Sequence, residues 1–97
     1  MVSEQTIRTG KWFVIETNDS NANATVSVFD TQNEAKKTFN KLLQKYRYDY
    51  IGTEVKHPPN ARFFTASNSQ NITVIVEMLP YLDIDLLKDK SIHLKVS

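Results

Sequence analysis

Residues 25–50 read TVSVFDTQNEAKKTFNKLLQKYRYDY, and this stretch decides the fold that we expect for the chain. Val26 and Val28 alternate with polar residues, which is typical of a strand with one buried face. Thr31 is followed three residues later by Glu34, a capping box that marks a helix start. Apolar residues then recur at a spacing that puts them on one side of a helix. They are Ala35, Phe39, Leu42, Leu43, Tyr46 and Tyr50.

The pattern predicts a long amphipathic helix over residues 32–48 that packs on a sheet. The region after Pro80 fits either a short helix with proline at its first position or an irregular excursion. We therefore expect an α+β fold, with a mainly antiparallel sheet of about five strands, one helix on one face, and the order ββαββ(α)β. Strand patterns occur at residues 11–17, 25–29, 50–57, 61–66, 71–79 and 91–96.

Residues 71–79 are expected at the centre of the sheet, and residues 11–17 either at the centre or beneath a second layer. Residues 11–17 place Trp12 and Val14 on one face and Phe13 and Ile15 on the other, so both faces are apolar. Residues 71–79 carry apolar residues on both faces as well. Strands with two apolar faces are typical of positions that are covered on both sides.

The composition bounds the class of protein. The 97 residues fit one domain over 1–97, of which residues 1–9 are polar and expected to be loosely ordered. Cysteine is absent, which excludes disulfides and thiolate chemistry. The first eleven residues lack the apolar stretch of a signal peptide, and no apolar run is long enough to span a membrane. We expect a cytoplasmic protein that does not associate with membranes.

No motif indicates catalysis or a bound cofactor. The chain has only two glycines, too few for a phosphate-binding loop. His57 and His93 lack the spacing of metal ligands, and the acidic stretch at 83–89 does not match a calcium loop. We expect no enzyme activity, no metal and no cofactor.

Two acidic residues within apolar strands remain as catalytic candidates. Glu16 and Glu77 would have raised pKa values if they faced each other in a dry cleft. Isolated acids in strands more often point to solvent. A small enzyme without a recognisable motif is therefore the least favoured of the functions considered.

Positive charge is concentrated in one segment. Residues 31–62 hold seven Lys or Arg residues against three Asp or Glu residues, although the net charge of the chain is +1. Three lysines recur every fourth residue on a stripe roughly 150° around the helix axis from the apolar side. An ordinary solvated helix face would look the same. The candidate binding residues are Lys37, Lys41, Lys45, Arg47, Tyr48, Lys56 and Arg62.

The sequence favours a non-catalytic protein that binds another protein, as an accessory, regulatory or inhibitory factor. Its size and its Asn- and Lys-rich composition are typical of small factors from bacteria or phages. The alternative is a nucleic-acid-binding protein that uses the basic face of helix 32–48. The near-neutral charge and the nine lysines against three arginines count against it. Self-association through an unpaired sheet edge is a further expectation.

Overall fold

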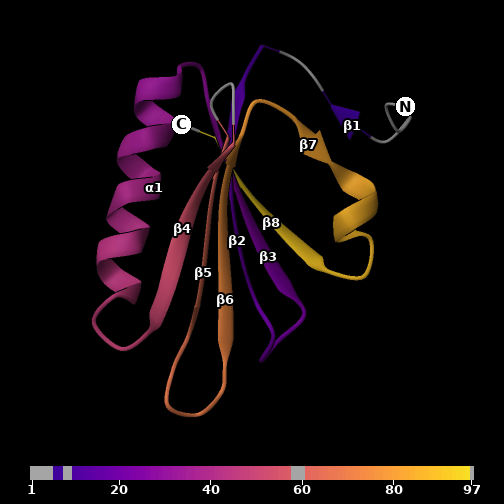
Figure 1. Cartoon of the computed structure of the whole chain (residues 1–97). Coiled ribbons are helices and arrows are strands. Elements are labelled where there is room, and N and C mark those ends of the chain that lie inside the picture. Colours follow the sequence, from indigo (N-terminus) through magenta and orange to yellow (C-terminus); the bar gives the residue numbers. More distant parts are fainter. Residues whose placement is uncertain (1–5, 8–9, 58–60, 97) are drawn as a thin grey trace.

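The computed structural model describes residues 6–7, 10–57 and 61–96. It contains an α+β fold in which one helix, α1 (Gln32–Tyr46), lies on a mixed sheet of six strands (Figure 1). The strands are β2 (Trp12–Asn18), β3 (Asn23–Phe29), β4 (Ile51–His57), β5 (Ala61–Ser67), β6 (Thr73–Leu79) and β8 (Ser91–Val96), and their order in the sheet is β4-β5-β6-β2-β3-β8.

Helix α1 begins as the capping box predicts. The hydroxyl oxygen of Thr31 accepts a hydrogen bond from the backbone N–H of Glu34 and donates one to its carboxylate. The helix ends at Tyr46, two residues before the predicted end, and is followed by a turn in which the Tyr46 carbonyl accepts from the N–H groups of Asp49 and Tyr50. Ala35, Phe39 and Leu43 are buried, which confirms the apolar side of the helix.

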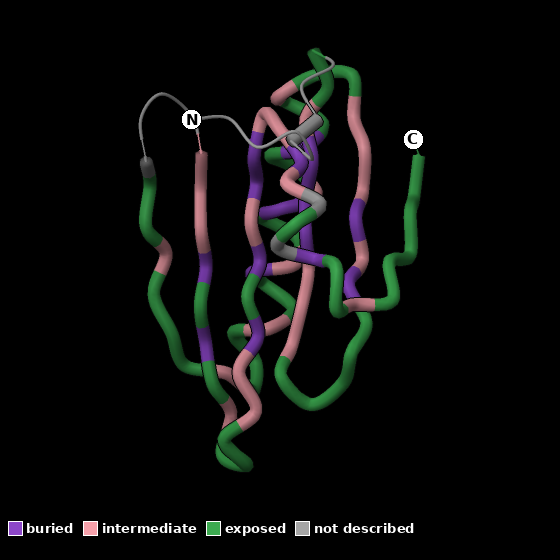
Figure 2. The backbone as a smooth tube through the Cα atoms, turned by 90° about the vertical axis from the view of Figure 1, so that its right-hand side faces the viewer, coloured by how far each residue is buried: buried purple, intermediate pink, exposed green. Residues whose placement is uncertain are grey.

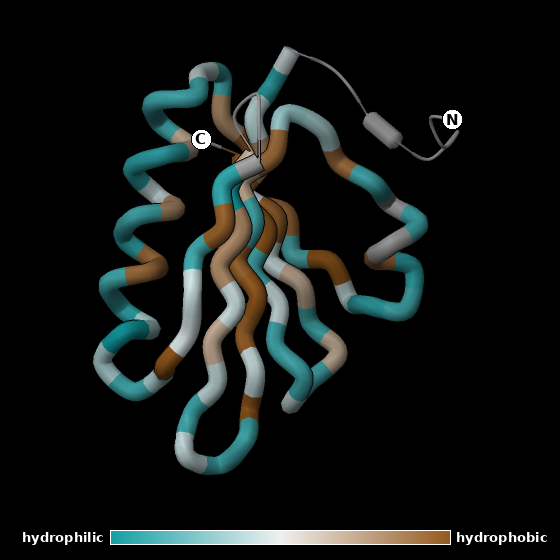
Figure 3. The backbone as a smooth tube through the Cα atoms, viewed as in Figure 1, coloured by the Kyte–Doolittle hydropathy of each residue, from teal (hydrophilic) through white to brown (hydrophobic). Residues whose placement is uncertain are grey.

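Both of these strands lie in the centre of the sheet, as expected for residues 71–79 and as one of the two alternatives for residues 11–17. β6 lies between β5 and β2, and β2 lies between β6 and β3, with antiparallel pairing throughout. Each strand buries residues on both faces, as Val14 and Ile15 show for β2. The hydrophobic residues accordingly concentrate in the middle of the sheet, while the outward turns of α1 are hydrophilic (Figure 3).

The expected sheet of about five mainly antiparallel strands is roughly right, but the order ββαββ(α)β is not. Three strands follow α1 as an antiparallel meander, β4, β5 and β6, where that order has two. β8 pairs in parallel with β3, so the sheet is mixed. The reason is the crossover: the chain leaves β6 at one end of the sheet and returns at the other, where the N–H of Ser91 donates to the Ala22 carbonyl. A crossover of this kind produces parallel neighbours.

The crossover segment resolves the ambiguity after Pro80. It forms a two-residue strand, β7 (Leu82–Asp83), and a short 3₁₀ helix, η1 (Ile84–Leu87), capped by the Asp83 side chain, which accepts from the Asp85 N–H. Pro80 lies before β7 and is not the first residue of a helix. β7 also pairs with β1 (Thr6–Ile7). The rest of the segment 1–9 that was expected to be loosely ordered lies outside the described residues.

The sheet therefore has a different cover on each face. Beneath α1, the buried residues are Val14, Ala35, Phe39, Leu43, Phe64, Ala66, Val74, Val76 and Met78. On the opposite face, which we call the open face, the buried cluster includes Leu82 and Leu87 of the crossover segment. Phe13, Ile15, Ala24, Val26 and Leu79 complete it.

Candidate binding surfaces

The lysines expected to form a basic surface lie on the exposed side of α1. The side chains of Lys37, Lys41 and Lys45 are all exposed, and Tyr48, in the turn after the helix, is 91% exposed. The Lys45 ammonium lies 5.3 Å from the ring centre of Tyr46. We call the surface formed by Lys37, Lys41, Lys45 and Tyr48 the basic helix face.

The two arginines of the candidate set contact the core instead. Arg62 forms a bidentate ion pair with Glu54, with distances of 2.9 Å from Nε and 2.8 Å from Nη2 to the two carboxylate oxygens. Its guanidinium also lies 4.6 Å from the ring centre of Phe39, which is fully buried. The hydrogen bond from Arg62 holds the pKa of Glu54 below its usual range. These contacts close one side of the helix-covered core.

Arg47 has a similar place at the end of α1. It is the C-cap residue, and its backbone N–H donates to the Leu43 carbonyl at 3.0 Å. Its guanidinium lies 5.5 Å from the ring centre of Phe64, a distance suited to a cation–π contact. Lys56 is exposed on edge strand β4. The structure thus separates the predicted set into outward-facing lysines and arginines that contact aromatic rings.

The acidic residues considered for catalysis lie on opposite faces of the sheet. Glu16 is on the helix-covered face, where its carboxylate accepts a hydrogen bond from the Tyr46 hydroxyl. Burial and this bond raise the pKa of Tyr46. Glu77 is on the open face, paired in register with Ile15. The two carboxylates therefore cannot act as a pair.

His93 does not join either carboxylate in what the structure describes. The Nε2 atom of His93 lies 3.3 Å from the Asn23 amide oxygen on the exposed edge strand. The His57 side chain lies outside the described residues. In the described parts of the chain, no three His, Asp or Glu side chains gather as a metal ion would require.

The open face carries a feature that the sequence analysis did not identify. Seven large apolar side chains are exposed among the described residues, and six of them lie on this face by strand register. Both edges of the sheet contribute exposed apolar side chains, because the crossover segment covers only the middle of the open face. Edge strand β8 is exposed along its whole length (Figure 2). The six are Ile51, Val55, Ile75, Ile92, Leu94 and Val96.

Strands β4, β5 and β6 form the larger part of this uncovered area, which we call the docking surface. Its apolar members are Ile51, Val55, Phe63 and Ile75, and the remaining positions are mostly Thr or Ser. Glu77 is the one charged residue among its described side chains. Strand alternation alone could have identified these positions, but their exposure depends on which strands lie at the edge and on what covers them.

Comparisons with known proteins give no family or fold assignment. No protein-family model matches the sequence, and neither the curated proteins nor the solved structures contain a significant match. Within the described residues, no helix combines the length and the apolar character needed to cross a membrane.

Proposed function

We propose that this protein acts by binding another protein, and that the partner covers the docking surface on β4, β5 and β6. The observation that carries the proposal is the exposure there of Ile51 at 90%, Val55 at 48% and Ile75 at 38%. Exposed large apolar residues that share one face of a sheet are a mark of interaction sites on soluble proteins. Their burial would contribute about 25 cal/mol for each Å² removed from water.

The composition of the docking surface supports a protein partner. The centres of protein interfaces are poor in charged residues, and here Glu77 alone is charged among the described side chains. Threonine and serine hydroxyls between the apolar residues can form hydrogen bonds across an interface, as the 2.8 Å contact between Ser67 and Thr73 hydroxyls does within the sheet. The lack of cysteine is consistent with a cytoplasmic location.

A test compares four baits in a capture experiment from the native source. The baits are the wild type, the docking variant Ile51→Lys/Val55→Lys, the edge variant Leu94→Lys and the helix variant Lys37→Glu/Lys41→Glu/Lys45→Glu. Any protein that depends on the docking surface is then purified and its affinity measured directly. We expect the docking variant to weaken binding at least tenfold. The edge and helix variants should bind within about twofold of the wild type.

Two results would contradict the proposal. Loss of the partner with the helix variant, and not with the docking variant, would assign binding to the basic helix face. Sedimentation of the pure protein that shows a dimer, lost on Ile51→Lys, would assign the docking surface to a second copy of the chain.

One observation keeps nucleic acid as a second candidate function: the basic helix face exposes three lysines beside Tyr48, which is 91% exposed and could stack on a base. Binding of this kind falls steeply with salt because it releases counterions. A titration with single-stranded DNA at 50 and 200 mM salt tests it. Affinity that is absent at 50 mM, or that is unchanged by the helix variant, would exclude this candidate.

A further inference from the structure

Among the described residues, Glu77 is an unpaired carboxylate surrounded by apolar side chains. Its cross-strand neighbours are Ile15 on β2 and Phe63 on β5, and Ile75 and Leu79 flank it on the same face of β6. The Glu77 side chain is partly buried, and within the described residues it has neither a hydrogen bond nor an ion pair. Burial raises its pKa, because removal from water disfavours the charged form. A cation brought beside it would remove this cost.

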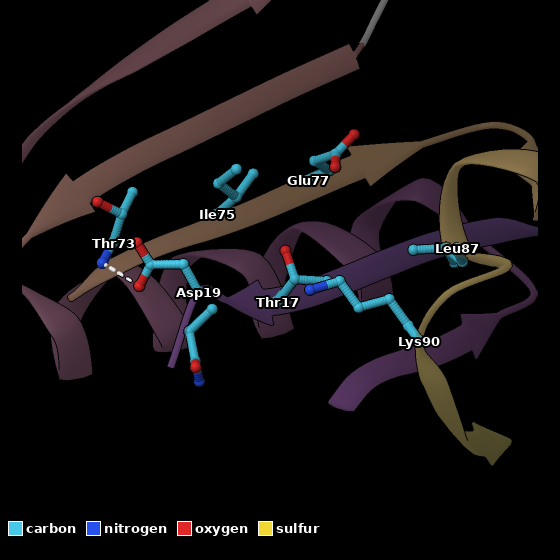
Figure 4. Close-up of a pocket in the computed structure, with 8 residues that line it drawn as sticks. Thr17, Asp19, Thr73, Ile75, Glu77, Leu87 and Lys90 are labelled. Carbon is cyan, nitrogen blue, oxygen red and sulfur yellow. Dashed lines mark hydrogen bonds between the residues drawn. The ribbon is translucent and has the colours of Figure 1, made fainter. Parts of the chain in front are cut away.

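A pocket of about 500 Å³ opens next to this carboxylate. Its floor is formed by strand residues that include Thr17 and Ile75, and its wall by Leu87 and Lys90 of the crossover segment (Figure 4). Asn18, Asp19 and Thr73 also line it, and the Thr73 N–H donates to the Asp19 carboxylate at 2.9 Å. The volume lies within the usual range of ligand pockets and exceeds that of any single side chain.

Lys90 lines the same pocket but forms no ion pair with Glu77. It extends from the crossover segment toward Thr17, while the carboxylate of Glu77 points away from it (Figure 4). The cationic partner that would neutralise Glu77 is therefore not supplied by the described parts of the chain.

We propose that the docking surface receives an arginine or lysine side chain of the protein partner, inserted into this pocket with its charge beside Glu77. This inference rests on the proposed function, because the partner that covers the docking surface supplies the side chain. The aliphatic stem of either residue would lie between Ile75 and Leu87. Arginine fits best, since its planar guanidinium can bind a carboxylate with two hydrogen bonds.

The pocket can be tested with the pure protein. N-acetyl-arginine amide is the probe, and N-acetyl-citrulline amide, of nearly the same shape but uncharged, is the matched control. Binding is followed by NMR, through the side-chain carboxyl carbon of Glu77 and the backbone amides of Thr17, Thr73 and Ile75. We expect the arginine probe to bind with a dissociation constant on the order of 1 mM, as suits one side chain. The citrulline probe should cause no shifts at the same concentrations.

Three variants decide what is recognised. Glu77→Gln should lower the affinity for the arginine probe at least tenfold. Asp49→Asn, which removes an equal charge in the turn after α1, should leave this affinity unchanged. Lys90→Met removes the competing ammonium and should leave binding equal or tighter. Equal binding of both probes, or unchanged binding to Glu77→Gln with the fold intact by its amide spectrum, would overturn the proposal. Loss of binding on Lys90→Met would overturn it too.

The same variants separate this inference from the proposed function. If Glu77→Gln lowers the affinity for the purified partner at least tenfold, the partner supplies the cation. If the docking variant loses the partner while Glu77→Gln binds it normally, the proposed docking surface is supported and the proposed cation site is wrong. If the arginine probe binds at Glu77 but the docking variant keeps the partner, the proposed function is wrong and the pocket serves a free cation.

Discussion

The two faces of the sheet are built from the same strands but differ in what covers them. Beneath the 15-residue helix α1, Phe39 and Phe64 are fully buried and Arg62 closes the side. On the open face, the four-residue helix η1 and the two-residue strand β7 cover only the middle. The comparison shows that one face is a completed core and the other leaves apolar residues available, which is why we place binding on the latter.

The largest expected difference between the faces is in stability. Phe39→Ala should lower the free energy of unfolding by about 3–5 kcal/mol, since it opens a cavity in a sealed core. Leu87→Ala, in the short helix η1 that covers the open face, should cost about 2–3 kcal/mol because Leu87 is 7% exposed and the short segment can relax. Urea denaturation at equilibrium measures both. An equal or reversed order would show that the open face is the better packed.

The ion pair at the edge of the helix-covered core should contribute less. Arg62→Met leaves Glu54, whose side chain is 16% exposed, without its partner and should cost about 1–3 kcal/mol at pH 7. Because pairing lowers the pKa of Glu54 in the folded state, its contribution is present above the usual carboxyl pKa and is lost as the pH falls through the folded value.

Unfolding by urea at pH 7 and at pH 3 checks this pH dependence. The difference in the free energy of unfolding between wild type and Arg62→Met should be smaller at pH 3. Lys56 is exposed and pairs in register with Arg62. The free energy of unfolding of Lys56→Met should stay within about 0.5 kcal/mol of the wild-type value at both pH 7 and pH 3. A gap that is independent of pH would indicate that Arg62 acts through its contact with Phe39 alone.

Glu77→Gln should have the opposite sign and stabilise the protein by about 0.5–2 kcal/mol at pH 7. Burial raises the pKa of Glu77, so its ionisation costs the folded state stability as the pH rises through that value. The gain in stability from Glu77→Gln should vanish at pH 3, where Glu77 is protonated in both the folded and the unfolded state. Lys90 and Asp19 are the other charged residues of the same pocket.

Glu16→Gln is the matched control on the helix-covered face. The Glu16 carboxylate accepts from the Tyr46 hydroxyl, so losing its charge should give no gain in stability. Thermal unfolding of both variants across this pH range provides the measurement. A gain for Glu16→Gln, or a loss for Glu77→Gln, would contradict the contrast between the faces.

The smallest effect is expected at the exposed edge. Leu94 is 60% exposed and lies in register with Val26, which is fully buried. Leu94→Thr should change the free energy of unfolding by less than about 0.5 kcal/mol, whereas Val26→Thr places a hydroxyl in the core and should cost about 1–3 kcal/mol. Denaturation curves of the two variants, compared with wild type, decide whether β8 leaves its apolar side uncovered.

Local signals made much of this fold predictable. The capping box of Thr31 and Glu34 and the apolar spacing after it are encoded within a few residues, so α1 was found to within two residues of its end. Residues 71–79 were expected at the centre of the sheet and residues 11–17 there or beneath a second layer, and strands β2 and β6 do lie at the centre. The parallel position of β8 depends on a crossover through residues 80–90, whose pattern fits several conformations.

The candidate sites were harder to predict because they depend on strand register and cover. Arg62 and Glu54 are eight residues apart and face each other only once β4 and β5 pair. Ile51 and Val55 alternate with polar residues as any half-buried strand does, and their exposure follows from β4 being an edge strand. Glu77 stood out in its apolar strand, but its neighbours come from two other strands.

The position of β8 has a consequence for the order of folding during synthesis. β8 follows every other described element in the chain and joins the sheet through β3 alone. Strands β2 to β6 and α1 can therefore assemble before residues 91–96 join them, because none of their pairings requires β8. The outer strand can then be added to an antiparallel sheet that is already complete.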